Sequence, residues 1–438
     1  MGKVTNTYDY QKITSFEPGL VHRYEWQNAA VFLHHQTKGH SGAYFTITIY
    51  GGSCTEKIPG TTHFLEHMLF KRKESLKSST AKNDPVRIIE TLGGELNAFT
   101  SKEYTCFELF SPASRILELI PHFLNIILHP NFTSELTQKE KKVIIQEIRE
   151  DNEDYELFAK EILFQKVFHS PLSRPIAGSI RSVNSITHTY LKQYLNKNFI
   201  PSHMIFTLVG DLKTKKVVDL LDEQFKDKKL SKKDICVRPL TGTSFNNLKP
   251  FSFTQIHREV QLSCLIISLP GVCTNHPYLL EHYFLNSYLT EGMSSLLYQE
   301  FRHKHPILYG INGHVNSFKD SGNIEISLSC EEKQIKKIYY QLNKIIQELA
   351  INPIPMDEIQ KVKRQMMDAW VLKFDDLEER NSHIYLNEMF KTLYYSKKRL
   401  EEKINRIDQE RIFVVTRNIA KTGPSFITVT KSPVDLSK

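Results

Sequence analysis

Two histidines and one glutamate near the start of the chain have the spacing of a metal site. They are His63, Glu66 and His67, within the stretch Thr62-His63-Phe64-Leu65-Glu66-His67-Met68-Leu69-Phe70. On a helix, residues four apart are neighbours, so both imidazoles can reach a single cation. Glu66 lies three positions after His63, and its carboxylate would stand close to water bound to that cation. The order His-x-x-Glu-His therefore predicts a metal site with a carboxylate base beside it.

A catalytic zinc ion usually takes three protein ligands and one water, so a third ligand must come from elsewhere in the chain. Glu140 and Glu147 are seven residues apart and share one face of a long helix expected at about 133–168. The apolar run Val143-Ile144-Ile145 gives that helix a side to bury. A carboxylate at the edge of this side would be costly unless a metal or hydrogen bonds satisfied it. Glu150 and Glu153 remain alternatives for the third ligand.

The surrounding sequence predicts strands and helices that would hold these residues. β-branched and aromatic residues predict strands at 31–35, 43–50 and 205–209, and a hairpin made of 95–101 and 104–110. Thr61 or Thr62, after the turn Pro59-Gly60, is a plausible N-cap for the helix of His63. A further helix begins near Pro85 and ends at Gly93-Gly94. Amphipathic helices are expected at about 114–128, which Pro121 should kink or split, and at 133–168.

The second half of the chain repeats this order of elements. It predicts strands at 260–269, 324–330 and 427–430 and helices near 278–282, at 333–349 and from 356, which indicates an internal duplication. A rough alignment places Glu281-His282 on Glu66-His67, with Tyr278 in the place of His63. The same alignment places Lys363 and Trp370 on Glu140 and Glu147. Only the first repeat can therefore hold the metal.

These patterns predict an α+β fold with two homologous domains, each a mostly antiparallel sheet packed against several long helices. We expect a metal-binding domain at 1–225, a linker at the lysine-rich stretch 226–250, and a second domain without metal at 251–438. A chain of 438 residues is long enough for two such cores.

The composition excludes several classes of protein. The 57 basic and 49 acidic residues give a mild net charge of +8, and the lysine clusters are short, so we expect no nucleic-acid binding. The 6 cysteines form no Cys-x-x-Cys pair, which argues against a disulfide framework or a thiolate zinc site. The first residues contain no apolar signal core and no run is long enough to span a bilayer. We therefore expect a soluble, cytoplasmic protein that binds no membrane.

Taken together, the ordered motifs resemble the pitrilysin/insulysin family of inverted zinc peptidases. The resemblance is to its half-length type, which includes the mitochondrial processing peptidases and bacterial relatives, and it covers most of the chain. It rests on 63–71, on Gly93-Gly94-Glu95-Leu96-Asn97-Ala98-Phe99-Thr100, on Glu140 and Glu147, and on 292–302 followed by Tyr309. The chain departs from the family pattern at His303 to Pro306 and in a longer, more basic segment at 71–84.

The resemblance implies a role for each of these residues. His63, His67 and Glu147 would be the zinc ligands, one zinc per chain, and Glu66 the general base. Glu140 would orient a ligand histidine. The stretch Asn97, Ala98, Phe99 and Thr100 would lie on an edge strand that receives the substrate by strand addition. Arg302 and Tyr309 would come from the second domain to bind the substrate and the developing oxyanion.

The function implied is a zinc-dependent endopeptidase that cleaves extended peptides inside a closable chamber, with a metal-bound water as the nucleophile. Since a chain of this length supplies half of the chamber of full-length relatives, we expect a homodimer, or a heterodimer with a related subunit. The alternative is a non-catalytic or regulatory subunit of such a heterodimer. A more remote third interpretation is a basic binding protein without chemistry.

Overall fold

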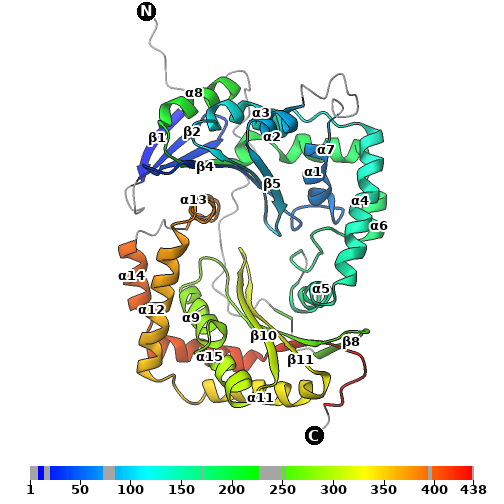
Figure 1. Cartoon of the computed structure of the whole chain (residues 1–438), viewed down its shortest axis with the longest axis vertical. Helices are drawn as coiled ribbons and strands as arrows, with labels where there is room; N and C mark the ends of the chain where they lie inside the picture. Colours follow the sequence, from blue (N-terminus) through cyan, green and yellow to red (C-terminus); the bar gives the residue numbers. More distant parts are fainter. Residues whose placement is uncertain are drawn as a thin grey trace, which may run out of the picture. The chain divides into compact units, whose positions relative to one another are not determined.

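The structure is a computed structural model of the chain, and it describes residues 8–13, 20–72, 84–169, 171–225, 248–249, 253–392 and 397–436. The described residues form two compact units (Figure 1). The first unit takes in those within Met1–Ile148, Pro175–Arg238 and Leu372–Lys397. The second takes in those within Arg149–Arg174, Pro239–Val371 and Lys398–Lys438. The units thus differ from the contiguous division expected from the repeats, because each includes a segment from the other half of the chain.

The first unit is built on a seven-stranded sheet with the order β1-β2-β3-β7-β4-β6-β5. Its strands are β1 (Tyr8–Ile13), β2 (Val21–Trp26), β3 (Val31–Gln36), β4 (Gly42–Tyr50), β5 (Glu95–Thr100), β6 (Tyr104–Pro112) and β7 (Met204–Gly210). All neighbours pair antiparallel except β3 and β7, which are parallel. The expected hairpin is β5–β6, and β5 lies at the edge of the sheet.

The second unit repeats this topology in a five-stranded sheet with the order β10-β11-β9-β12-β8. Its strands are β8 (Phe253–His257), β9 (Ser263–Pro270), β10 (Leu308–Ser317), β11 (Gly322–Cys330) and β12 (Ser425–Thr430). The single parallel pair is β8 with β12, as β3 pairs with β7 in the first sheet. The order therefore corresponds to β5-β6-β4-β7-β3, strand by strand, which confirms the α+β fold with an internal duplication.

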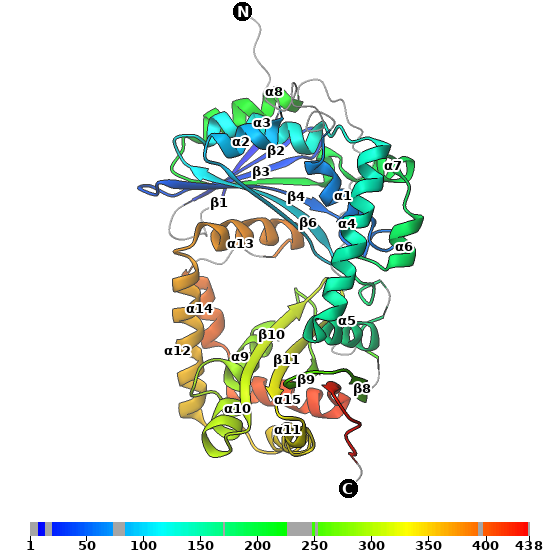
Figure 2. The ribbon, with the colours of Figure 1, turned by 45° about the vertical axis from the view of Figure 1, so that its right-hand side comes forward.

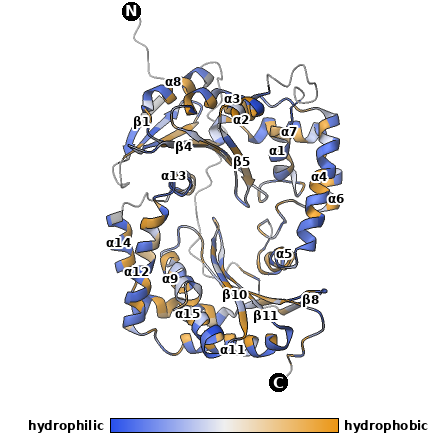
Figure 3. Ribbon diagram, in the orientation of Figure 1, coloured by the Kyte–Doolittle hydropathy of each residue, from blue (hydrophilic) through white to orange (hydrophobic). Residues whose placement is uncertain are grey.

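Helices cover both sheets. The first unit contains α1 (Thr61–Phe70), α2 (Pro85–Thr91), α3 (Ile116–Leu128), most of α4 (Ser134–Glu153), α6 (Ile180–Ser185), α7 (His188–Asn198), the short η3 (Pro201–His203), α8 (Thr214–Phe225) and α13 (Leu377–Phe390). Its core joins apolar residues of the sheet, such as Phe45 and Phe107, to those of α1 and α3, such as Phe64 and Phe123. Figure 3 shows hydrophobic and hydrophilic residues alternating along α4, as expected for a helix with one buried side.

The second unit also contains helices that cover its sheet. They are α5 (Tyr155–Val167), α9 (Leu279–Thr290), α10 (Leu296–Tyr298), the π-helical turn η5 (Gln299–Lys304), η6 (Glu332–Gln334), α11 (Ile335–Leu349), most of α12 (Met356–Lys373), α14 (Lys397–Asn405) and α15 (Gln409–Thr422). Leu285, Phe301 and Ile338 belong to its main core, together with strand residues such as Ile326 and Phe426.

Two helices are exchanged between the repeats. α5 follows α4 in the chain, but its residues Ala159 and Leu163 pack with Ile266 of β9 and Val429 of β12 in the second unit. Conversely, α13 follows α12 but packs on β4 and β7 of the first unit. Figure 2 shows α13 along one face of the first sheet, with α2, α3 and α8 on the other face.

The expectation of one helix over 133–168 is wrong, because Asp154 divides it. The Asp154 side chain accepts hydrogen bonds from the backbone N–H groups of Glu156 and Leu157, so it ends α4 and caps α5. Asp376 caps α13 in the same way in the second repeat. Pro121 does not split the helix expected at 114–128, because it lies inside α3, which continues to Leu128.

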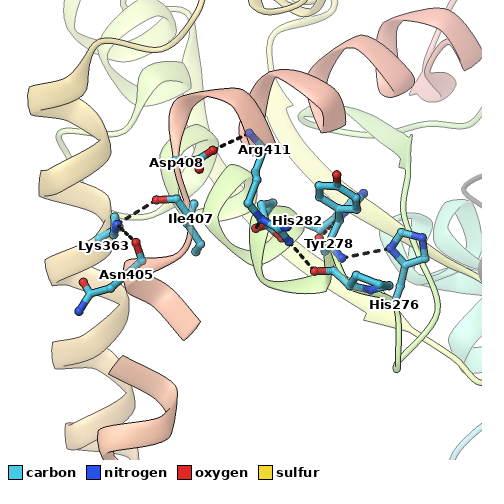
Figure 4. Close-up of polar contacts among 10 residues, drawn as sticks. His276, Tyr278, His282, Lys363, Asn405, Ile407, Asp408 and Arg411 are labelled. Carbon is cyan, nitrogen blue, oxygen red and sulfur yellow. Dashed lines mark hydrogen bonds and ion pairs between the residues drawn. The ribbon is translucent and has the colours of Figure 1, made fainter. Parts of the chain in front are cut away.

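Hydrogen bonds from a buried lysine within α4 and within α12 correct the register between the repeats. Lys141 donates from Nζ to the carbonyl oxygen of Asn184 at 3.0 Å, and Lys363 donates to that of Asn405 at 2.9 Å (Figure 4). Lys363 is thus the counterpart of Lys141. The counterparts of Glu140 and Glu147 are then Val362 and Ala369 rather than the Lys363 and Trp370 of the rough alignment.

The linker expected at 226–250 lies outside the described residues apart from Leu248 and Lys249. Leu248 forms an isolated β-bridge with Phe168. Among the residues that the structure describes, no helix is long and apolar enough to cross a membrane.

Candidate metal centre

The helix α1 is held at its N-terminus by a buried carboxylate. Its N-cap is Gly60, with φ of 89° and no side-chain cap, so the expectation of Thr61 or Thr62 as N-cap is wrong. Instead Glu56 accepts hydrogen bonds from the backbone N–H groups of Gly60, at 2.5 Å, and Thr62, at 2.7 Å. A glycine is needed at position 60, because a Cβ there would lie 2.5 Å from the carbonyl oxygen of Ala177 and φ is positive.

Three of the sequence-predicted residues come together beside this helix. Nε2 of His63 lies 3.4 Å from Oε1 of Glu147, and Nε2 of His67 lies 3.5 Å from Oε2 of the same carboxylate. One ligand atom from each of the three residues can be chosen so that all lie within 4.8 Å of one another. α1 supplies the histidines and α4 supplies the glutamate, and Figure 1 shows the two helices beside each other.

The arrangement fits a zinc ion. Two ligand atoms that each lie about 2.0–2.2 Å from zinc in a tetrahedron are about 3.4 Å apart. Each histidine nitrogen lies at about this distance from one of the two carboxylate oxygens of Glu147. The buried Oε2 of Glu147 also has no hydrogen-bond partner among the described residues. A cation would satisfy this oxygen, and two imidazoles with one carboxylate form an ordinary zinc donor set.

Glu140 orients the second histidine. His67 donates from Nδ1 to Oε1 of Glu140 at 3.0 Å, since a carboxylate can only accept, and this directs Nε2 towards Glu147. Nζ of Lys71 lies 3.3 Å from the other oxygen of Glu140. Burial opposes ionisation of Glu140, but the hydrogen bonds and charges of His67 and Lys71 outweigh it and lower its pKa. The pKa of Glu147 is likewise lowered, chiefly by its hydrogen bond with His63.

Glu66 lies on the same helix, with its carboxylate against the edge strand. The hydroxyl of Thr100, the last residue of β5, donates to Oε2 of Glu66 at 2.6 Å. On the opposite face of β5, Asn97 donates from Nδ2 to Oε2 of Glu108 at 3.0 Å. Burial raises the pKa of Glu108. Ala98 and Phe99 lie between them on the same strand.

Arg302 and Tyr309 belong to the second unit and contact each other. Arg302 donates from Nη1 to the backbone oxygen of Tyr309 at 2.5 Å. The Tyr309 ring is exposed, and its hydroxyl donates to Glu331 at 3.4 Å.

Within the described residues, the second repeat carries other residue types at the positions of the candidate metal ligands on α1 and of Glu66. When Phe64-Leu65 of α1 is placed on Phe284-Leu285 of α9, the buried residues Thr61, Thr62, Phe64, Leu65, Glu66 and Leu69 all fall on buried residues of α9. Tyr283, Asn286 and Ser287 then stand where the first repeat has His63, Glu66 and His67. The pairing of Glu281-His282 with Glu66-His67 is therefore wrong. Glu281 instead forms an ion pair with Arg411 at 2.6 Å. Figure 4 shows Arg411 beside His282 and Tyr278.

Comparison with known protein families matches both halves of the chain. Residues 31–179 match the profile described as insulinase, peptidase family M16. Residues 185–366 match the profile described as the peptidase M16 inactive domain. The chain belongs to peptidase family M16. The repeat that matches the inactive domain of M16 is the one in which tyrosine, asparagine and serine replace the metal motif.

Individual M16 relatives agree with this assignment. An uncharacterized zinc protease of Streptomyces coelicolor is 26% identical over 391 residues, covering 86% of this chain and 81% of its own. One from Bacillus subtilis is 24% identical over 370 residues, covering 83% and 87%.

Solved structures share the M16 fold. A protease from Helicobacter pylori superposes with a TM-score of 0.81 at 16% identity, covering 97% of this chain and 99% of its own. A Pseudomonas fluorescens structure described as a peptidase M16 inactive domain gives 0.80 at 15% identity, covering 93% and 97%.

Sequence reasoning missed two residues that hold the site, Glu56 and Lys71, and one contact of a residue that it named, Thr100. Glu56 has no motif around it, and a carboxylate four residues before a helix is too common to be recognised. Thr100 was expected on the substrate strand, but its hydroxyl contact with Glu66 depends on the tertiary packing of β5 against α1. Lys71 lies within the recognised motif, and its spacing of four residues from His67 is the signal that could have found it.

Proposed function

We propose that the chain is a zinc-dependent endopeptidase that cleaves extended peptides. The observation that carries the proposal is the convergence of His63, His67 and Glu147, with Glu66 on the same helix. Curated relatives are named zinc proteases, which supports zinc as the metal. One zinc per chain is part of the proposal, and it is supported by the single cluster of this kind among the described residues.

The residues of the site have separate tasks in this proposal. His63, His67 and Glu147 would hold zinc, which lowers the pKa of a coordinated water towards neutrality and polarises a carbonyl. Glu66 accepts the proton of the attacking water and returns it to the leaving amine. The open edge of β5, from Asn97 to Thr100, receives the peptide by strand addition.

The proposal extends to residues of the second repeat. Arg302 and Tyr309 bind the substrate and the developing oxyanion, and the peptide is enclosed in a closable chamber. Support comes from the resemblance of 292–302 to the family and from the contact between Arg302 and Tyr309. A single oxyanion donor is typically worth about 3 kcal/mol of transition-state stabilisation.

The test is the Glu66→Gln variant. We expect it to retain one zinc per chain and to lose cleavage of a quenched peptide mixture by at least about 100-fold, since it cannot accept the proton. Glu118→Gln, on the exposed surface of α3, is the matched control and should cleave like wild type. Cleavage by Glu66→Gln at the wild-type rate would contradict the proposal.

A second candidate is a non-catalytic subunit of a related peptidase. It is favoured by the fold-level likeness, over 93% of this chain, to a structure described as an inactive domain. Wild-type protein that binds zinc yet cleaves no peptide, alone or at high concentration, would favour this candidate. Cleavage that a chelator stops and zinc restores would exclude it.

A further inference from the structure

The contact between Thr100 and Glu66 joins the edge strand to the proposed base. Both residues are buried, with 8% and 9% of their surfaces exposed. The hydroxyl of Thr100 lies 2.6 Å from Oε2 of Glu66, a short distance typical of a hydrogen bond to a charged carboxylate. Among the described residues, Thr100 is the one whose side chain hydrogen bonds to Glu66.

This contact restricts a side chain that would otherwise rotate. A glutamate has three side-chain torsions, and fixing them costs conformational entropy. The Thr100 hydroxyl holds Oε2 and leaves Oε1 available for a proton. Thr100 is β-branched and lies in a strand, so its own χ1 is restricted. The donor is therefore fixed before it orients the carboxylate.

The second repeat shows that the fold alone does not produce this contact. Ser317 ends β10 as Thr100 ends β5, since each pairs with the residue five positions further along its hairpin. The Ser317 hydroxyl donates to Thr274 at 3.1 Å. Asn286, which stands in the place of Glu66, donates instead to Glu291 at 3.2 Å. The hydrogen bond from the hydroxyl at the end of the edge strand to the helix is therefore found in the first repeat, in which the helix carries Glu66.

We propose that Thr100 is a positioning residue, whose hydroxyl holds the Glu66 carboxylate in the orientation needed to accept a proton. This inference rests on the proposed function and deepens it, because the strand that would bind the peptide also aligns the base. Thr100 is thus both part of the strand that would bind a peptide and the hydrogen-bond donor that holds the carboxylate of Glu66.

The test compares Thr100→Val, which keeps the shape and removes the hydroxyl, with Thr100→Ser, which keeps the hydroxyl. We expect Thr100→Val to lower kcat by about 10- to 100-fold, as for a small misplacement of a reacting group. Its KM should change less than about 3-fold, because strand addition uses the backbone. Zinc content should be unchanged, and Thr100→Ser should remain within about 3-fold of wild type.

Thr105→Val is the matched control. Thr105 faces Thr100 across the hairpin and is also buried, but its hydroxyl donates to the carbonyl oxygen of Gly51. This variant removes the same group from the same sheet without touching Glu66, so it should keep the wild-type kcat. An equal loss in Thr105→Val, or no rescue by Thr100→Ser, would overturn the proposal.

A second readout is independent of activity. Crystal structures of the metal-free wild-type and Thr100→Val chains should show the Glu66 carboxylate in one position in the first and displaced or in several positions in the second. An unmoved carboxylate in Thr100→Val would overturn the proposal. If the wild-type chain cleaves no peptide, the proposed function fails, while this comparison still decides whether Thr100 positions Glu66.

Discussion

At the scale of single residues, the centre is built from charged groups that are each held by a partner. Glu140 accepts a hydrogen bond from His67 and forms an ion pair with Lys71. Partners of this kind fix the orientation and basicity of a ligand histidine. The neutral counterpart of Glu140 in the second repeat, Val362, can do neither.

We expect Glu140→Gln to weaken zinc binding by about 10- to 100-fold, the usual effect of losing such a partner. A glutamine can still accept a hydrogen bond from His67, but it lacks the charge that stabilises the imidazole. The dissociation constant would be measured by competition with a chelator. Glu135→Gln, on the exposed start of α4, is the control; an effect as large in that variant would contradict the assignment.

We also expect Glu56→Gln to destabilise the fold by about 1–3 kcal/mol, because one of its two hydrogen bonds to the start of α1 is lost in a buried place. The replacement amide would point a donor at a backbone N–H group. Urea unfolding would show the change as a lower midpoint. Glu90→Gln, exposed on α2, should leave the midpoint unchanged, and equal midpoints for both variants would count against the role of Glu56.

At the scale of elements, much of the fold could be predicted from residue patterns. The strands at 43–50 and 205–209 and the hairpin of β5 and β6 are regular apolar or alternating runs, and the structure confirms them. The prediction that His63 and His67 lie side by side required only the geometry of one helix. Local periodicity is sufficient for features of this kind.

The remaining features depend on contacts between segments far apart in the chain. Asp154 lies within a helix-forming stretch. Its role as the N-cap of α5 becomes apparent only when α5 is known to be a separate helix that packs on β9 and β12. The register between the repeats could not be read from motifs, because Glu281-His282 imitates Glu66-His67 by chance. Buried positions such as Phe64 and Phe284 decide that register, and burial is a tertiary property.

The helix α13 is fixed to the first sheet by polar contacts. Asn381 donates to the backbone oxygens of Tyr44, at 3.0 Å, and Thr207, at 3.1 Å. Glu388 accepts two hydrogen bonds from the guanidinium of Arg23, at 3.0 and 3.2 Å. Burial opposes ionisation of Glu388, but Arg23 and Lys391 outweigh it and lower its pKa.

This shift predicts a dependence of stability on pH. Because the folded pKa of Glu388 is lowered, its contribution is complete above the unfolded value of about 4.3 and is lost as the pH falls through the folded value. Glu388→Gln should therefore lower the melting temperature at pH 7, with a smaller difference from wild type below about pH 4. Glu379→Gln on the same helix, whose ion pair with Lys373 is exposed, is the control and should change little. A difference that is constant with pH would contradict the assignment.

At the scale of the whole molecule, the resemblance to the half-length type of this family implies that the two repeats of the chain supply half of a chamber. We therefore expect a dimer, formed with a second copy or with a related subunit. Light scattering after size exclusion at micromolar concentration would give twice the chain mass of 51.0 kDa for a homodimer. A monomer that cleaves peptides at the same specific rate over a wide concentration range would contradict this expectation.

The exchange of α5 and α13 has a consequence for how such a chain can arise. One repeat made alone would leave a sheet face without its helix, and a helix without the sheet that it covers. Two identical copies can each cover the exposed sheet face of the other by exchanging these helices, as in a domain-swapped homodimer. Fusion of the two copies would preserve every connection seen here. It would also release one copy from the need to bind metal, so that tyrosine, asparagine and serine could replace its ligands and base without loss of the shared fold.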